Sequence, residues 1–300
     1  MRLIKANKRI DRAAVALLLA GAFAPAILAQ GPPPPYFSPQ QLDGLVSRIA
    51  LYPDSLLSQV LAAATFPDAI PDAAGWADQH HYLTGDALAA AIQADRLPWD
   101  PSVQALLPFP AVLDMMASDM SWTRQLGDAF LSNSGAVMDA VQRERRRAYD
   151  YGYLRTNPQA VVTPGPYIVI APVNPGLIYV PVYEPLVVYA PPRPGFFVGG
   201  AIRFGWGFSI GAAFRPWGWG YNRFDWDRHA VVINNNIWNR TYVNRNVYVH
   251  PYPVERYAPE RRFEGHELHE RSEREREAYR GGRERVEEHR GRPEEHDRRR

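Results

Sequence analysis

Residues 38–67 read SPQQLDGLVSRIALYPDSLLSQVLAAATFP, and two apolar stripes run through them at helical spacing. Ser38 and Gln41 form a predicted capping box at the start of a first helix. Pro53 ends that helix because proline removes a backbone donor, and Asp54 is the predicted cap of a second helix. The two stripes comprise Leu42, Leu45, Val46 and Ile49, then Leu56, Leu57, Val60, Leu61 and Ala64. We expect a helical hairpin whose two apolar faces bury each other.

Further short helices are expected as far as residue 156. Their predicted spans are 68–81, a helix capped by Thr84, a helix capped by Asp100, 111–120, 121–131 and 135–153. Frequent prolines keep these helices short. Residues 38–138 carry eleven Asp against three Arg, so this part is acidic. Many of these Asp stand where helices begin, and the helix dipole explains most of them.

The hydrophobic period changes after residue 157. Short β-branched and aromatic runs occupy residues 161–162, 167–171, 177–183 and 186–189, separated by Pro and Gly turns. This pattern predicts a small antiparallel sheet that packs on the helices. Pro181 lies inside one run, which favours an edge strand.

The quoted stretch resembles the opening of the bacterial family known only as domain of unknown function 3300. The likeness continues through residues 99–103 (WDPSV), 109–110 (FP), 127–130 (GDAF) and 178–185, and it spans roughly residues 38–190. No activity is assigned to that family. The resemblance therefore implies a fold shared with the family and no reaction, cofactor or partner.

Residues 193–254 combine Gly, aromatic residues and Arg. Seven Arg stand against two Asp, and five of the eight Trp lie between positions 206 and 238. Aromatic faces suit sugars, and guanidinium groups suit phosphate or carboxylate. The polymer-binding candidates are Arg203, Trp206, Arg215, Trp217, Trp219, Arg223, Trp226, Trp238, Arg240, Tyr242 and Arg245. A hydrophobic core or an oligomer interface is the equally weighted alternative for the aromatic residues.

Two further interpretations concern this segment. Residues 231–250 alternate between apolar and Asn or aromatic positions, which predicts a strand prone to self-association. Residues 196–214 are apolar, but Arg203 and several glycines argue against a transmembrane helix.

Metal binding and catalysis have weak signals. Asp225, Asp227 and His229 alternate and would face one way along an extended segment; His80–His81 and the tail histidines are further weak candidates. No spacing matches a closed zinc site, there is no Cys, and no nucleophile or phosphate-loop motif occurs. We expect no cofactor and no resident metal.

Both ends of the chain have distinctive compositions. Five basic residues precede an apolar run from Ala13 to Leu28, typical of a secretory signal, with cleavage expected after Ala29. Removing residues 1–29 changes the formal net charge from +2 to about −2. Residues 255–300 hold fourteen Arg and fourteen acidic residues with few apolar groups, so we expect a disordered tail.

The sequence thus predicts an exported α+β protein, periplasmic or envelope-associated in a bacterium. Its expected segments are a signal peptide (1–29), a Pro-rich linker (30–37), an acidic helical module (38–156), a small β-sheet region (157–192), a β-prone Gly/aromatic/Arg-rich segment (193–254) and a disordered Arg/Glu-rich tail (255–300). We expect looser packing after residue 193 than before it.

The leading hypothesis is a non-enzymatic scaffold or adhesion module. It would bind an anionic envelope polymer, a membrane surface or other copies of itself, and no specific nucleic acid. The competing hypothesis is an enzyme or accessory factor that acts on envelope polysaccharide with a carboxylate at a helix end. A third is a subunit that binds a partner in a groove between residues 56–64 and Trp76.

Overall fold

A computed structural model describes residues 33–195 and 198–254, and the elements below belong to one compact unit that begins at Tyr36. The helices are α2 (Pro39–Val46), α3 (Asp54–Ala64), η1 (Pro67–Ala69), α4 (Ile70–Gln79), α5 (Gly85–Asp95), α6 (Pro101–Gln104), α7 (Pro110–Ser118), α8 (Met120–Ser132), α9 (Ser134–Asp150), α10 (Pro185–Val188) and η2 (Ala212–Trp217). The strands are β1 (Ala160–Thr163), β2 (Val169–Pro172), β3 (Leu177–Tyr183), β4 (Ile202–Ser209), β5 (Arg223–Asp225), β6 (Ala230–Ile233) and β7 (Asn236–Ile237). The protein is therefore α+β, as predicted.

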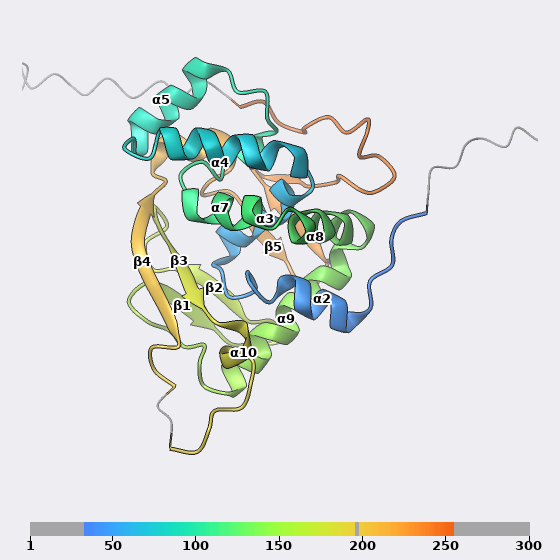
Figure 1. Cartoon of the computed structure of the whole chain (residues 1–300), viewed down its shortest axis with the longest axis vertical. Helices are drawn as coiled ribbons and strands as arrows, with labels where there is room; N and C mark the ends of the chain where they lie inside the picture. Colours follow the sequence, from blue (N-terminus) through green and yellow to red (C-terminus); the bar gives the residue numbers. More distant parts are fainter. Residues whose placement is uncertain (1–32, 196–197, 255–300) are drawn as a thin grey trace, which may run out of the picture. The chain divides into compact units, whose positions relative to one another are not determined.

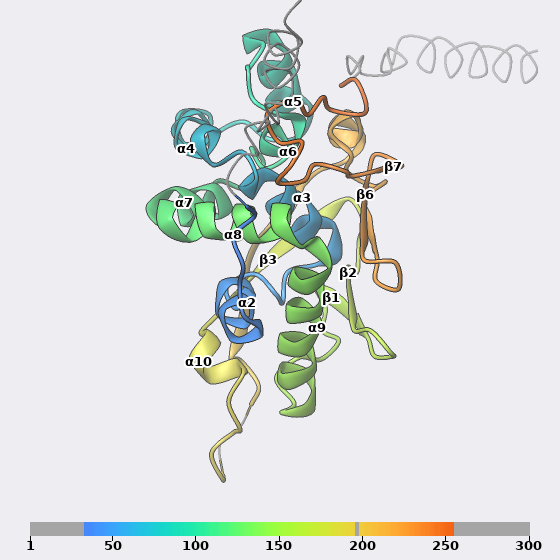
Figure 2. The ribbon, with the colours of Figure 1, turned by 90° about the vertical axis from the view of Figure 1, so that its right-hand side faces the viewer.

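Helix α3 lies at the centre of the helical part, with α8, α6 and the strands around it (Figures 1 and 2). Every residue from Leu56 to Ala64 is buried. The predicted groove for a partner between residues 56–64 and Trp76 is therefore not an open surface. Helices α2 and α3 also do not form the expected hairpin, because α2 packs chiefly on α9 and α3 packs on α8 and α6.

The helix starts show which local predictions succeed. Ser38 and Gln41 form the predicted capping box, and the Asp100 carboxylate accepts from the backbone N–H of Ser102. Asp54 instead begins α3 without capping it. Its carboxylate has another partner, described below.

Three small antiparallel sheets pair β1 with β2, β3 with β4, and β5 with β6 and β7. Pro181 pairs at an irregular step of the β3–β4 register, and β3 has one paired neighbour among the described strands, so the edge assignment fits. Residues 186–189, expected as a strand, instead lie in or directly after α10. Pro185 takes the first turn of that helix and the Glu184 carboxylate accepts from the N–H of Leu186.

The alternating stretch 231–250 does not form one strand. It turns back at Asn234 and Asn235, both with positive φ, to make the β6–β7 hairpin. Asparagine tolerates this left-handed conformation better than most residues, and such a pair favours a tight hairpin turn. No residue of the described part after Ile237 is in a strand.

The aromatic segment shares the main core with the helices. Trp217 and Trp219 are each only 1% exposed, and Phe214 is fully buried. Trp217 Nε1 donates to Gln104 Oε1 at 2.9 Å, and Trp219 Nε1 donates to the Ala105 carbonyl at 3.0 Å. The expected loose packing after residue 193 is thus wrong for these residues, because their rings belong to the same core as the helices.

Arg145 on α9 is fully buried and joins distant segments of the chain. Its Nε donates to Ala50 O at 2.8 Å, and Nη2 donates to Tyr52 O at 3.0 Å. Its Nη1 donates to Ile168 O at 2.8 Å and contacts the Asp54 carboxylate at 2.6 Å. Its guanidinium also lies 5.2 Å from the Trp226 ring centroid. One side chain thereby holds α9, the α2–α3 connection, the β1–β2 hairpin and the β5–β6 turn together.

Replacing Arg145 with Met should lower the free energy of unfolding by about 3–5 kcal/mol, because the largely buried Asp54 carboxylate loses its ion-pair partner and three carbonyls each lose a donor. Arg124→Met removes an exposed ion pair with Asp68 and should change it by at most about 1 kcal/mol. Urea unfolding of both variants measures the difference. Equal losses in the free energy of unfolding of the two variants would mean that the buried contacts of Arg145 add no more stability than an exposed ion pair.

A second pair of variants tests the approach of α8 to α3. A Cβ at Gly127 would overlap the carbonyl oxygen of Ala64, so Gly127→Ala should cost about 1–3 kcal/mol. Gly75 lies on α4 with open space around the position of a Cβ, so Gly75→Ala should stabilise by about 0.5–1 kcal/mol. The opposite signs are checked by thermal or urea unfolding. A neutral Gly127 variant would show that the two helices can separate without cost.

Candidate functional site

The polar face of α9 carries the residues of the candidate site. Asp139, Gln142, Arg143 and Arg146 follow the spacing i, i+3, i+4, i+7, which places them along one side of the helix. Arg147 extends this face by one position, whereas Arg145 points into the core. We call the hollow on this face the arginine hollow.

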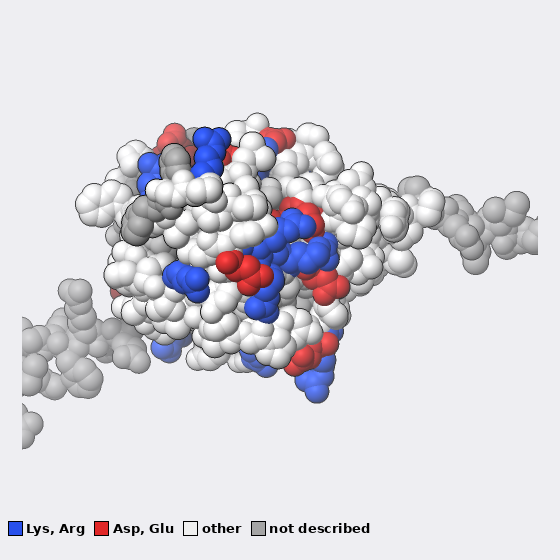
Figure 3. All heavy atoms as spheres, turned by 90° about the horizontal axis from the view of Figure 1, so that it is seen from below, with Lys and Arg blue, Asp and Glu red and all other residues white. Residues whose placement is uncertain are grey.

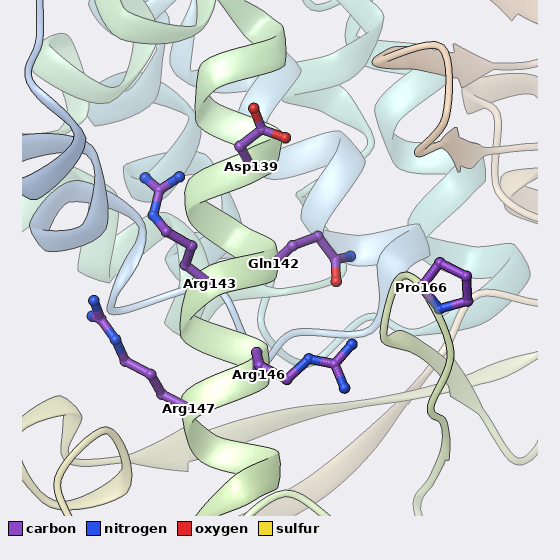
Figure 4. A pocket seen from close by; sticks show the side chains of 6 residues that line it. All are labelled: Asp139, Gln142, Arg143, Arg146, Arg147 and Pro166. Carbon is purple, nitrogen blue, oxygen red and sulfur yellow. The ribbon is translucent and has the colours of Figure 1, made fainter.

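The arginine hollow has a volume of about 490 Å³ and is lined by Asp139, Gln142, Arg143, Arg146, Arg147 and Pro166. Figure 4 shows Gln142 and Arg146 directed towards Pro166, while Arg143 and Arg147 project from the opposite edge of the same face. On the face seen in Figure 3, basic side chains gather at the centre with acidic ones beside them.

Two of these arginines are bound by carboxylates. Asp43 on α2 pairs with Arg143 at 2.6 Å and with Arg147 at 3.2 Å. Arg147 also pairs with Glu144 at 2.5 Å. Arg146 differs, because its Nη2 donates at 2.7 Å to the carbonyl of Gly165, which carries no charge. Its positive charge is therefore not neutralised by an ion pair within the described residues.

Glu144 is the buried acid beside this hollow, with 3% of its side chain exposed. Burial raises the pKa of its carboxyl from 4.5 to about 7, Arg147 opposes the rise, and the charge of Asp43 adds to it. The phenols of Tyr183 and Tyr189 lie nearby and both donate to the Ser47 carbonyl, at 2.9 and 3.0 Å. Burial raises the pKa of both phenols above their usual range. These phenols stay neutral and act as hydrogen-bond donors.

A second hollow, of about 390 Å³, adjoins the first at Pro166. We call it the aromatic hollow, since Tyr167, Phe224 and Trp226 contribute rings to its lining. Its other lining residues are Pro166, Val169, Arg223, Asp225 and Asp227. It contains two of the predicted polymer-binding residues, Arg223 and Trp226.

The remaining predicted polymer-binding residues are dispersed. Trp217 and Trp219 belong to the core, and Trp238 packs on Phe130 with ring centroids 4.9 Å apart. Arg203, Trp206 and Arg215 are exposed on β4 and η2, and Trp206 is 91% exposed. They do not line either hollow.

Three more of these candidates, Arg240, Tyr242 and Arg245, lie in the irregular segment after β7. Arg240 donates to the Thr65 carbonyl and lies 3.7 Å from the Phe66 ring centroid. Arg245 lies 3.6 Å from the ring centroid of Tyr242. The contacts of Arg240 attach the segment to the end of α3, whereas the Arg245–Tyr242 contact stabilises the segment internally.

The three weak metal candidates do not converge. Asp225 pairs with Arg228 at 3.1 Å, and His229 contacts Asp139 at 2.9 Å. Residues 226–229 form a turn, so the extended alternation assumed from the sequence is wrong. Within residues 33–195 and 198–254, no three His, Asp or Glu side chains are placed to hold a metal ion.

The membrane-span interpretation of residues 196–214 concerns a segment that contains β4 and the start of η2, with residues 196–197 outside the described ranges. Among the described helices, none has both the length and the apolar character required to cross a bilayer.

Sequence reasoning missed most of the arginine hollow. The helix expected at 135–153 ends in a run of charged residues at 143–147, and this run alone does not distinguish the buried Arg145 from the more accessible arginines beside it. The i, i+3, i+4 spacing of positions 139, 142, 143 and 146 was the available signal. Nothing local indicated that Asp43 and Pro166 would lie beside that face.

Glu144 makes stability depend on pH. The unfolded chain loses this proton near pH 4.5 and the folded chain near 7, so the folded state binds more protons in this window and the group's contribution to stability falls as pH rises. The glutamine in Glu144→Gln stays neutral at every pH. The free energy of unfolding of this variant, relative to the parent, should therefore rise by on the order of 3 kcal/mol as the pH increases from about 4.5 to about 8.

Urea unfolding at several pH values measures this difference. Asp86→Asn, at an exposed position in the first turn of α5, is the control and should show a change of at most about 0.5 kcal/mol across the same range. A pH-independent difference for Glu144→Gln would rule out a raised pKa for this carboxyl.

Comparison with known proteins places this fold in a family. The uncharacterized protein YacH of Escherichia coli (strain K12) is 34% identical over an alignment of 223 residues, which covers 59% of this chain and 36% of that protein. The chain thus matches about a third of the length of this curated relative. No solved structure matches this chain.

The family model described as "Protein of unknown function (DUF3300)" matches residues 38–258, which extends the likeness beyond residue 190 and through β4–β7. The chain therefore belongs to this family of proteins of unknown function.

Proposed function

We propose that this protein is a non-enzymatic adhesion module of the bacterial cell envelope that binds an anionic polymer through the arginine hollow. The observation that carries the proposal is Arg146. Its guanidinium lines a hollow, is held in place by the Gly165 carbonyl and has no carboxylate partner among the described residues.

Such a site suits phosphate or carboxylate groups. A guanidinium presents parallel N–H donors that match these anions in a bidentate manner, and its charge strengthens the hydrogen bonds. Arg143 and Arg147 stand on the same helix and share the carboxylate of Asp43. The other carboxylate bound to Arg147 is the buried Glu144, whose pKa is raised to about 7, so the two arginines add positive potential. Repeated anionic groups on a polymer would gain from this arrangement, with a strong dependence on salt.

The envelope location is supported by the composition of residues 1–29. A basic start followed by an apolar run is the pattern of a chain directed to export. Export would bring the arginine hollow into contact with the anionic polymers and lipids of the envelope.

One observation favours the competing function, cleavage of an envelope polysaccharide. Asp43 and Glu144 share Arg147, and a carboxyl with a pKa of about 7 can serve as a general acid near neutral pH. Against this, only 3% of the Glu144 side chain is exposed, so a substrate does not reach this carboxyl in the described conformation. We therefore rank binding above catalysis.

The test uses the purified protein and two soluble polyanions, inorganic polyphosphate and polygalacturonate, followed by calorimetry at low and high salt. Arg146→Gln should weaken binding about tenfold or more, because one charge-assisted contact is worth about 1.5–3 kcal/mol. Arg124→Gln removes an equal charge from an exposed position on α8 and should have less than about a twofold effect.

Four outcomes would contradict the proposal. Equal losses in both variants would indicate non-specific attraction, and the absence of binding to either polyanion would remove the function. Turnover of purified envelope polysaccharide that is abolished by Glu144→Gln would favour the enzyme. Binding to anionic lipid vesicles in place of both polymers would assign the hollow to a membrane surface.

A further inference from the structure

The aromatic hollow is the strongest feature that the proposed function does not use. It adjoins the arginine hollow at Pro166, which lines both. We infer that the aromatic hollow is a subsite for an uncharged pyranose ring, an inference that rests on the proposed function. The ligand is then an acidic polysaccharide in which an uncharged sugar lies next to a charged unit.

The rings of this hollow are held in a fixed stack. Phe224 and Trp226 are nearly parallel, 22° apart with centroids separated by 4.4 Å. Tyr167 is inclined by 21° to Trp226 at 6.3 Å. Trp226 Nε1 donates to Asp54 Oδ2 at 3.3 Å, and the Arg145 guanidinium lies near its ring. Phe224 and Trp226 are largely buried, which leaves Tyr167 as the most accessible ring.

Two charged side chains of this hollow are free to contact hydroxyl groups. Arg223 and Asp227 are exposed, and neither makes a side-chain hydrogen bond or an ion pair with the described residues. Arg223 supplies donors and Asp227 supplies acceptors. A sugar ring presents an apolar C–H face and a rim of hydroxyls, so an aromatic surface beside a donor and an acceptor is complementary to it.

The charge balance distinguishes the two hollows. The lining of the aromatic hollow holds Arg223, Asp225 and Asp227, and Arg228, which lies outside the lining, pairs with Asp225, so this hollow has no excess of positive charge. The lining of the arginine hollow holds three arginines against one carboxylate, Asp139. The carboxylates that bind Arg143 and Arg147 are Asp43 and the buried Glu144, whose pKa is about 7. An uncharged unit therefore fits the first hollow, and an anionic unit fits the second.

The spacing between the hollows is held by the β1–β2 hairpin. Gln142 Nε2 donates to Ile168 O at 3.1 Å, and the N–H of Ile168 donates to Gln142 Oε1 at 2.8 Å. Arg146 holds the Gly165 carbonyl at the tip. Since α9 and this hairpin are connected at both points, neighbouring units of one polymer can occupy both hollows without rearrangement.

The experiment compares two probes that differ in sugar content. Hyaluronate oligosaccharides alternate a uronate with an uncharged amino sugar, whereas inorganic polyphosphate contains no sugar. Tyr167→Ala should weaken hyaluronate binding about tenfold, as expected for loss of a stacking ring, and change polyphosphate binding less than about twofold. Tyr82→Ala removes a 69% exposed tyrosine elsewhere and serves as the control.

A second variant guards against an effect of Tyr167→Ala on folding. Asp227→Ala changes an exposed, unpaired side chain and should also weaken hyaluronate binding selectively. Thermal unfolding checks both variants. Unchanged hyaluronate binding in Asp227→Ala and in folded Tyr167→Ala would overturn the sugar subsite, as would equal losses for both probes.

The two proposals can fail separately. Loss of binding in Arg146→Gln with no effect of the aromatic-hollow variants would retain the anion site and reject the sugar subsite. No effect of Arg146→Gln on either probe would instead reject the arginine hollow itself.

Discussion

The structure depends on the burial of one guanidinium. Arg145 satisfies carbonyl groups of residues 50, 52 and 168 and the carboxylate of Asp54, which come from segments far apart in the chain. A buried charge is costly unless it is paired and its donors are satisfied, so these acceptors must be held in place together. The regular spacing of side chains around an α-helix then fixes the directions of the residues next to Arg145. With Arg145 inward, residues 143, 146 and 147 must lie on other sides of α9, where they form the arginine hollow.

The same side chain also positions the aromatic hollow. Arg145 lies against the ring of Trp226, while Asp54, the partner of Arg145, accepts from the indole N–H. Trp226 in turn is stacked with Phe224. A change at Arg145 would therefore disturb both hollows through packing, although it lines neither of them. The two candidate subsites are parts of one arrangement.

What could be predicted from sequence was mainly local. The capping box at Ser38, the cap at Asp100 and the short-helix array depend on residues within a few positions of one another. Asp54 was predicted as a helix cap and no burial was predicted for Arg145, because a carboxylate at a helix start and an arginine in a basic run usually face water. Trp217 and Trp219 were placed among binding candidates since their partners, Gln104 and Ala105, lie more than a hundred positions away. Exposure decides whether an aromatic residue is core or surface, and exposure is set by such distant contacts.

The acidic character of the helical module has an internal explanation. Asp43, Asp54, Asp68 and Asp119 pair with arginines, and Asp100 and Asp119 also cap helices. Part of the complementary positive charge comes from α9, whose Arg143, Arg145 and Arg147 pair with Asp43 and Asp54 on α2 and α3. Arg146 is the exception on that helix, because it faces a neutral carbonyl where Arg143, Arg145 and Arg147 face carboxylates. An arginine of α9 without a carboxylate partner thus lines the arginine hollow and is directed towards Pro166, the residue that the two hollows share.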